Sequence, residues 1–265
     1  MHELLNNKDM IFQLMKREVL ERYRGSSLGV LWSFAYPVFM LLVYMFVFGF
    51  IFKMKWGVAP GSGQTTNVPF GIIMFSGLIM HAFLAECLIR SCALITGNQQ
   101  YVKKVVFPLP ILSVVSVGAA VFHLLAGIMI LFLFMLGFGV YPSLTMLYMP
   151  LVLLPFILLM LGMSWILSSL CVFIRDIAQI MGVLVTVLLF LAPIFYPLSA
   201  VPGAYQAWMY LNPLTVIIEQ FRAVVLFEQH PDFLLLGGYY LVALGVMAIG
   251  FGFFKRTKGA FADVV

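Results

Sequence analysis

The longest stretch of this chain without a charged side chain runs from Val105 to Ile174. A helix needs about 20 consecutive apolar residues to cross the hydrocarbon core of a bilayer, so this stretch is too long for one span and long enough for two. Near its middle, Tyr141-Pro142-Ser143 is typical of a turn. The stretch therefore predicts two membrane-spanning helices joined by a tight connection.

Composition extends this interpretation to all 265 residues. Charged residues make up 9% of the chain, against roughly 25% in a soluble domain, and the mean hydropathy is +1.09. A membrane barrel would show segments of about ten residues with alternating polarity, and the sequence has none. We therefore expect an all-α integral membrane protein.

Six transmembrane helices are expected, within a single membrane domain. Residues 1–27 are expected to form an N-terminal interfacial helix, residues 28–254 a bundle, and residues 255–265 a tail. The approximate bounds of the spans are Leu28–Phe52, Phe70–Ile95, Leu109–Gly139, Leu147–Ile174, Ile177–Tyr196 and Phe233–Phe254.

Positive charges sort by position along the chain. They concentrate before residue 25, at Lys103 and Lys104, at Arg175, and at Lys255–Lys258. Six spans place these four segments on one side, which the positive-inside rule makes cytoplasmic. We therefore expect a multi-pass protein with both termini in the cytoplasm, and we attribute the net charge of +5 to topology and not to nucleic-acid binding.

Metal and disulfide chemistry finds no support in the sequence. Cys87, Cys92 and Cys171 form no C-x-x-C pair and leave an odd thiol. The first 24 residues carry charges throughout and lack an early apolar core, so no cleavable signal peptide is expected.

The segment before the first span predicts an amphipathic helix in the membrane interface. Phe12, Met15, Val19 and Tyr23 recur at helical spacing as an apolar stripe. Arg24 would meet lipid headgroups, and Gly25 with the serines after it would allow a bend into the membrane. An ordinary soluble helix before a span is the alternative.

Residues 193–232 are too apolar for a free loop, yet prolines interrupt them. We expect re-entrant short helices on the periplasmic side, because broken backbone at membrane depth is tolerated where protein buries it or water lines it. Asn212 and Pro213 predict a helix start, and Glu219 and Arg222 a pair within that helix. Tyr205, Trp208 and Tyr210 would form an outer aromatic ring. Two more spans are the alternative, but pieces of about 14 residues are too short to cross.

Few ionisable side chains fall inside the predicted spans. Glu86 and Arg90 stand four residues apart in the order that favours pairing. His81 and His123 are isolated histidines, for which hydrogen-bonded packing and a proton relay are the two interpretations. Asp176, three residues before Gln179, predicts a capping pair for the following span.

Aromatic residues suggest a path for a sugar polymer. Sugars offer CH faces that stack on aromatic rings, and hydroxyls that bond to tyrosine and tryptophan. Packing against lipid or other helices is the alternative. The candidates are Trp32, Tyr36, Phe39, Phe46 and Phe50 on one face of the first span, and Phe195 and Tyr196 at the outer end of the fifth.

Three stretches carry a resemblance to a known family. They are RYRGSSLGVLWSFAYPV at residues 22–38, GNQQYVKKVVFPLPIL at 97–112 and FIRDIAQI at 173–180. In their order on six spans, followed by Asn212-Pro213 and a downstream arginine, they resemble the permease subunits of ABC exporters for bacterial surface polysaccharides. O-antigen exporters are the closest type, and the resemblance covers essentially the whole chain.

The resemblance implies a transport permease in the bacterial inner membrane, not an enzyme. It implies a homodimer joined to two copies of a cytoplasmic ATP-binding subunit, which would bind ATP and magnesium, so that this chain needs no cofactor. The cargo would be an undecaprenyl-diphosphate-linked polysaccharide. Consistently, the chain has no Gly-x-x-x-x-Gly-Lys-Ser/Thr loop for nucleotide phosphates.

Two sets of residues have expected roles in such an exporter. Arg22, Arg24 and Gly25 would meet the lipid headgroup at the interface. The cytoplasmic loop before the third span and the Arg-Asp pair before the fifth would couple to the ATPase, through Asn98, Gln100, Tyr101, Lys103, Lys104, Arg175 and Asp176. An anchoring loop whose lysines bind lipid phosphate is the alternative for the first.

Other functions stay open on the sequence alone. Within transport they are a teichoic acid or capsule exporter permease and a small-molecule or drug exporter of the same architecture. A proton-coupled carrier would have to use Glu86, His81 or His123, and no internal repeat supports it. No membrane-edge cluster of paired acids with a histidine supports a membrane-bound transferase.

Overall fold

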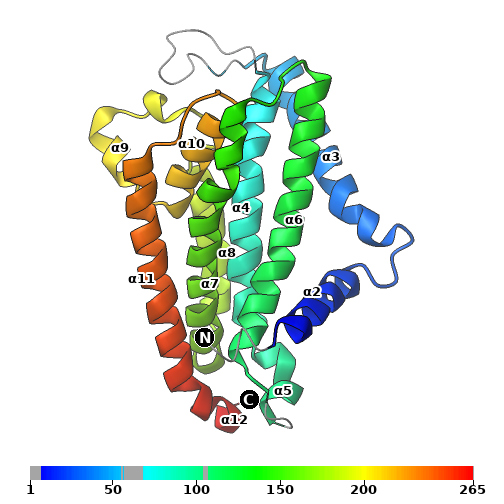
Figure 1. The fold of residues 1–265 in the computed structure, drawn as a ribbon, viewed down its shortest axis with the longest axis vertical. Coiled ribbons are helices and arrows are strands. Elements are labelled where there is room, and N and C mark those ends of the chain that lie inside the picture. The colour runs from blue at the N-terminus through cyan, green and yellow to red at the C-terminus, as the bar shows by residue number, and fades with distance from the viewer. Residues whose placement is uncertain (1–6, 55, 57–67, 104–106, 265) are drawn as a thin grey trace.

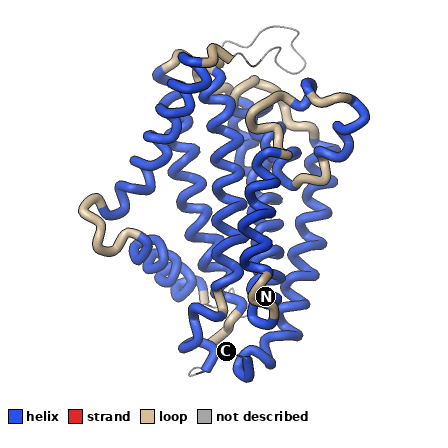
Figure 2. The backbone as a smooth tube through the Cα atoms, turned by 180° about the vertical axis from the view of Figure 1, so that it is seen from behind, coloured by secondary structure: helices blue, strands red, loops and turns tan. Residues whose placement is uncertain are grey.

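The protein is described by a computed structural model over residues 7–54, 56, 68–103 and 107–264. Within these ranges every regular element is helical, as predicted (Figures 1 and 2). The α-helices are α2 (Lys8–Arg22), α3 (Trp32–Tyr44), α4 (Phe70–Ala93), α5 (Gln99–Lys103), α6 (Pro110–Gly137), α7 (Met149–Phe173), α8 (Ile177–Phe190), α9 (Gly203–Met209), α10 (Pro213–Val225), α11 (Phe233–Thr257) and α12 (Phe261–Val264).

Five helical segments of the described chain are long and apolar enough to cross a membrane. They are Gly29–Ile51, Phe70–Ala93, Pro110–Gly137, Leu144–Phe173 and Phe233–Ala260. The first joins α3 to a π-helix, η2 (Met45–Ile51). Five of the six predicted spans therefore coincide with helices of spanning length, close to their expected bounds. The sixth corresponds to α8, whose 14 residues extend about 21 Å, short of the ~30 Å hydrocarbon core, so six spans stay a prediction.

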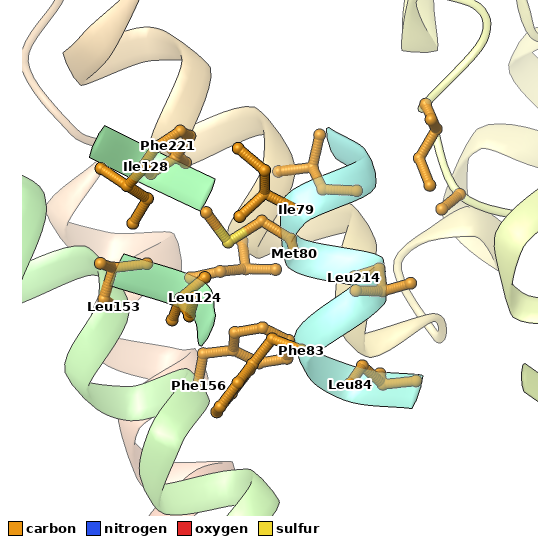
Figure 3. Packing of buried hydrophobic residues seen from close by; sticks show 14 of the residues in the cluster. Ile79, Met80, Phe83, Leu84, Leu124, Ile128, Leu153, Phe156, Leu214 and Phe221 are labelled. Atoms are coloured by element: carbon orange, nitrogen blue, oxygen red, sulfur yellow. The ribbon is translucent and has the colours of Figure 1, made fainter. Parts of the chain in front are cut away.

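Helix α4 forms the centre of the bundle and packs against α6, α7, α8 and α10. Figure 3 shows Met80 and Phe83 of α4 facing Leu124 of α6 and Phe156 of α7. The Phe83 and Phe156 rings meet edge to face, with centroids 5.2 Å apart. Such close packing matters in a membrane, where lipid tails are as apolar as the core and hydrophobicity alone does not drive helices together.

Helices α7 and α11 approach most closely through two glycines. A Cβ added to Gly162 would lie 2.7 Å from the backbone of Met247, and one added to Gly250 would overlap the carbonyl of Gly162. Small residues of this kind let membrane helices pack backbone against backbone. A buried hydrogen bond of 2.8 Å from Ser91 to Ser164 joins α7 to α4 as well.

The segment after α8 folds back through the short helices α9 and α10 before α11 begins (Figure 1). The predicted helix start is confirmed: the Asn212 side chain accepts a hydrogen bond from the amide of Leu214, and Pro213 is the first residue of α10. Ten of the thirteen α10 residues are buried, so this helix is part of the protein core. Its re-entrant character in a membrane stays a prediction.

Arg222 of α10 is 1% exposed and holds this region together. Its guanidinium donates to the carbonyls of Ile73, Pro193 and Ile194 and to Ser76 Oγ, at 2.5–3.2 Å. It also lies 4.5 Å from the ring centroid of Trp56. The predicted pairing with Glu219 is confirmed at 3.6 Å, but it is longer than the bonds to the carbonyls. Arg222 thereby ties the break after α8 to α4 and α10.

Helix α2 lies obliquely against α6, outside the bundle (Figure 1). Of the predicted apolar stripe, Met15, Val19 and Tyr23 are partly buried, whereas Phe12 is 68% exposed. Met15 fills a notch left by Gly118 of α6. Gly25 has a φ of +86°, which confirms the predicted bend, because this conformation suits glycine.

Candidate functional site

A pocket of about 750 Å³ opens between α3, α4 and α6. Its aromatic lining comes from two helices: Trp32, Tyr36 and Tyr44 of α3, and Phe75 and Phe83 of α4. This aromatic lining ends at a polar cluster contributed by α2, α4 and α6. The pocket thus offers an apolar, ring-rich body and a charged end, which suits an amphiphilic ligand.

Glu86 of α4 is the centre of the polar cluster. Its Oε1 accepts hydrogen bonds from Nη1 of Arg22 at 2.5 Å and from Nη1 of Arg90 at 3.1 Å. Nδ1 of His123, on α6, lies 3.0 Å from the same oxygen. The predicted pairing of Glu86 with Arg90 is therefore confirmed, and it is one part of a larger network. A carboxylate that is 12% exposed needs such partners, because burying an unpaired charge is costly.

Further contacts fasten α2 to this cluster. Glu18 pairs with Nη2 of Arg90 at 2.7 Å, and the hydroxyl of Tyr23 lies 3.2 Å from Nε2 of His123. Burial raises the pKa of the Glu18 carboxyl, and the Arg90 guanidinium opposes that shift. Two arginines and two carboxylates thus balance in charge where α2 meets the bundle.

The two isolated histidines both have partners. His81 Nε2 lies 3.0 Å from the carbonyl of Val185, and His123 lies between Glu86 and Tyr23. These contacts match the interpretation of hydrogen-bonded packing. Within the described chain, no group of three or more His, Cys, Asp or Glu side chains is arranged to hold a metal ion.

The structure divides the candidate channel aromatics into three groups. Trp32 and Tyr36 line the pocket. Phe39, Phe46 and Phe50 continue the same face of the first span and are 63%, 58% and 75% exposed. The third group, Phe195 and Tyr196, lies beyond the end of α8, where Phe195 stacks on Phe190 and the Tyr196 hydroxyl donates to the Phe190 carbonyl.

Three exposed aromatics belong to the segment around α9. Tyr205, Trp208 and Tyr210 all present large parts of their rings to the surface. Whether they form a ring at a pore exit depends on an assembly, so this role stays a prediction.

Helix α5, which carries Gln100, Tyr101 and Lys103 of the predicted coupling residues, lies at the end of the bundle that also holds α12 (Figure 1). Tyr101 of α5 accepts a hydrogen bond of 3.0 Å from Arg17 of α2 and packs on Phe107. Asn98 donates to the carbonyl of Leu94, whereas Gln100 and Lys103 are exposed. Lys104 lies outside the described residues. The short helix α5 is therefore joined directly to α2.

Arg175 and Asp176 are exposed between α7 and α8. The predicted capping pair is wrong: Asp176 takes helical φ and ψ, and its side chain makes no capping hydrogen bond. A capping side chain normally requires an extended backbone at that position, and this turn does not provide one. Arg24 is exposed as well, next to Gly25.

Sequence reasoning missed two features of the site. It did not bring Arg22 and His123 to Glu86, and it did not foresee the complete burial of Arg222. The available signal was an ionisable residue inside an apolar stretch, which requires a partner. For Glu86, that rule identified only the neighbour on its own helix.

Comparison with known proteins places these observations in a family. Residues 10–226 match the family described as ABC-2 type transporter. The chain is 25% identical to the O-antigen export system permease protein RfbA of Myxococcus xanthus, over 99% of this chain and 98% of the relative. It is 24% identical to RfbA of Klebsiella pneumoniae, over 97% and 95%, and 21% identical to the polysialic acid transport protein KpsM of Escherichia coli, over 93% of both.

Proposed function

Because this chain belongs to the ABC-2 type transporter family, we propose that it is the membrane permease of an ATP-driven polysaccharide exporter. The observation that carries this proposal is similarity to O-antigen export permeases along essentially the entire chain. Relatives named for polysialic acid transport also match, with lower identity. The proposed cargo is an O-antigen-like polysaccharide linked to a lipid diphosphate.

Two copies of the chain would enclose the path of the polymer in the bacterial inner membrane. The exposed face of Phe39, Phe46 and Phe50 supports this assembly, because a second copy could cover it and line the path with aromatic rings. Helix α8, which buries only Val185 within the protomer, offers a second uncovered surface. It would complete six spans, with α9 and α10 as the periplasmic re-entrant helices.

A separate cytoplasmic ATP-binding subunit would supply the energy, since this sequence has no phosphate-binding loop. In this arrangement both termini lie in the cytoplasm. Helix α5, with the exposed Arg175 and Asp176, would be the surface that subunit contacts. Its contact with α2 through Tyr101 and Arg17 supports this role, because it gives a direct physical connection to the pocket.

Reconstitution tests the proposal. The permease would be co-purified with a candidate ATP-binding subunit from the same organism and placed in liposomes with a lipid-linked O-antigen. We expect ATP-dependent movement of the polymer across the bilayer, and none with a hydrolysis-deficient ATPase. Absence of a stable complex, or transport driven by a proton gradient without ATP, would contradict the proposal.

The aromatic path has its own test. Replacing Tyr36 or Phe39 by leucine keeps an apolar side chain at the site but removes the aromatic ring, so the rate of export should fall. Phe138→Leu is the matched control, because Phe138 follows the C-terminal end of α6, is 52% exposed and does not line the pocket. If all three variants export at the rate of the parent, ring stacking is not the basis of polymer movement.

A further inference from the structure

Of the three side chains that contact Glu86, Arg22 can move away while Arg90 and His123 remain in contact. Arg22 is 45% exposed, whereas Arg90 and His123 are 32% and 15% exposed. If Arg22 moves away, Glu86 keeps the guanidinium of Arg90 and the imidazole of His123. The cost of releasing Arg22 is therefore low, since the buried carboxylate is not left alone.

The cluster also forms the charged end of the aromatic pocket. Arg22, Arg90 and Glu86 all line it, beside the rings of Trp32 and Tyr36. Guanidinium groups bind phosphate through paired, charge-assisted hydrogen bonds. A lipid with a phosphate head and a long hydrocarbon chain matches both parts of this pocket, but its head would meet arginines already occupied by Glu86.

We propose that Glu86 is an internal substitute for the phosphate of the lipid that carries the cargo. In the absence of lipid, Glu86 holds Arg22 and fixes the end of α2. A phosphate-bearing head displaces it, so that Arg22 binds the head while Glu86 keeps Arg90 and His123. This proposal rests on the proposed function, and it adds a means by which cargo frees α2.

The geometry of α2 links this exchange to the cytoplasmic face. Arg22 is the last residue of α2, and Arg17, five residues earlier, is bonded to Tyr101 of α5. A change at Arg22 therefore moves the same rigid helix that contacts α5. Binding of a lipid in the pocket would therefore be transmitted through α2 alone to the surface that is proposed to contact the ATPase.

The experiment measures lipid binding to the permease–ATPase complex in nanodiscs of zwitterionic lipid. A fluorophore on Lys16→Cys reports the position of α2, since Lys16 is exposed and the native cysteines are buried. Titration with an isoprenyl diphosphate should change the signal. Glu86→Gln should lower the apparent Kd about tenfold, the effect of removing one charge-assisted competitor, and should shift the lipid-free signal towards the bound one.

Two further variants separate exchange from damage to the fold. Arg22→Lys can still pair with Glu86 but loses the paired hydrogen bonds to phosphate, so it should weaken binding while leaving the lipid-free signal unchanged. Glu21→Gln is the matched control, because its ion pair joins it to Arg17 within α2, and it should behave as the parent. Unchanged or weaker binding in Glu86→Gln would overturn the proposal.

Two comparisons identify what occupies the pocket. Phosphatidylglycerol offers a phosphate on a different lipid and should act at least tenfold more weakly; an equal response would overturn the assignment to the carrier lipid. Export is measured in parallel. If the parent complex exports polymer but Glu86→Gln binds the lipid no more tightly, only the proposed exchange at Glu86 is wrong. If the parent complex exports no polymer, the proposed function itself is contradicted.

Discussion

The bundle and helix α2, which lies outside it, are held by different kinds of contact. In the bundle, Arg222 bonds to backbone carbonyls, and Gly162 packs against the backbone of Met247. Around α2, side-chain ends meet side-chain ends: Arg22 with Glu86, and Arg17 with Tyr101. Backbone atoms cannot move without moving a helix, whereas side-chain ends can exchange partners.

This difference indicates which part of the molecule can change position. A bundle tied through its backbone is a fixed frame, and α2 is a helix attached to it by replaceable contacts. Even Met15, which fills the notch at Gly118, contacts it through its flexible thioether end. The comparison predicts that equivalent substitutions are more harmful in the frame than at the attachment of α2.

The largest effect is expected for Arg222→Met. The substitution keeps most of the apolar volume but leaves the carbonyls of Ile73, Pro193 and Ile194 without their donor. Each buried carbonyl left without a hydrogen-bond donor costs about 1–3 kcal/mol. We expect a large drop in the thermal stability of the purified protein in detergent.

Arg222→Lys sharpens this test. Lysine keeps the charge but lacks the planar group that reaches several carbonyls at once, so it should recover only part of the stability. If the Arg222→Met protein is as stable as the parent, the hydrogen bonds of Arg222 do not hold the bundle together.

Glycine substitutions compare the two regions directly. Gly162→Ala places a methyl group 2.7 Å from the backbone of Met247, and we expect a loss of about 1–3 kcal/mol, typical of overpacking. Gly118→Ala meets the movable end of Met15 instead, so its cost should stay below about 1 kcal/mol. Thermal melting of both variants measures the difference, and equal losses would contradict the distinction.

Much of the fold follows from the sequence, because the bilayer restricts the choice. Apolar stretches of spanning length identified α4, α6, α7 and α11 within a few residues, and the turn at Tyr141-Pro142-Ser143 lies between α6 and α7. Backbone groups at membrane depth must be satisfied within the chain. Apolar length therefore specifies a helix almost by itself.

Contacts between helices could not be obtained in the same way. The sequence pairs Glu86 with Arg90 because both lie on α4, but Arg22 and His123 reach Glu86 from helices whose packing is set by shape. The aromatic face of α3 was identifiable from its spacing. Its division between the pocket and an uncovered surface depends on the angle at which α3 leaves the bundle.

Two predicted helix starts allow a matched comparison of the buried region around α10 with the exposed connection between α7 and α8. Asn212 accepts a hydrogen bond from the amide of Leu214, inside the buried region around α10. Asp176 makes no such bond at the start of α8. Asn212→Ala should therefore cost about 1 kcal/mol, and Asp176→Ala less than about 0.5 kcal/mol, both measured by thermal unfolding. If Asp176→Ala loses more stability than this, Asp176 caps α8 in solution, contrary to the structure.

The smallest effect is expected where α2 meets Arg90. Glu18→Gln removes one ion pair, 2.7 Å long, from a partly exposed site, and Arg90 keeps Glu86 as a partner. Such pairs contribute about 0.2–1 kcal/mol, so global melting should barely change. Amide hydrogen exchange should nevertheless rise selectively in α2, because a helix held by a few replaceable contacts opens before the bundle does. Glu21→Gln, which breaks only an ion pair within α2, should leave the amide hydrogen exchange of α2, relative to that of the bundle, unchanged. If both variants behave alike, α2 is not held by its contact with α4, and the contrast between a fixed frame and a replaceable attachment does not apply to this helix.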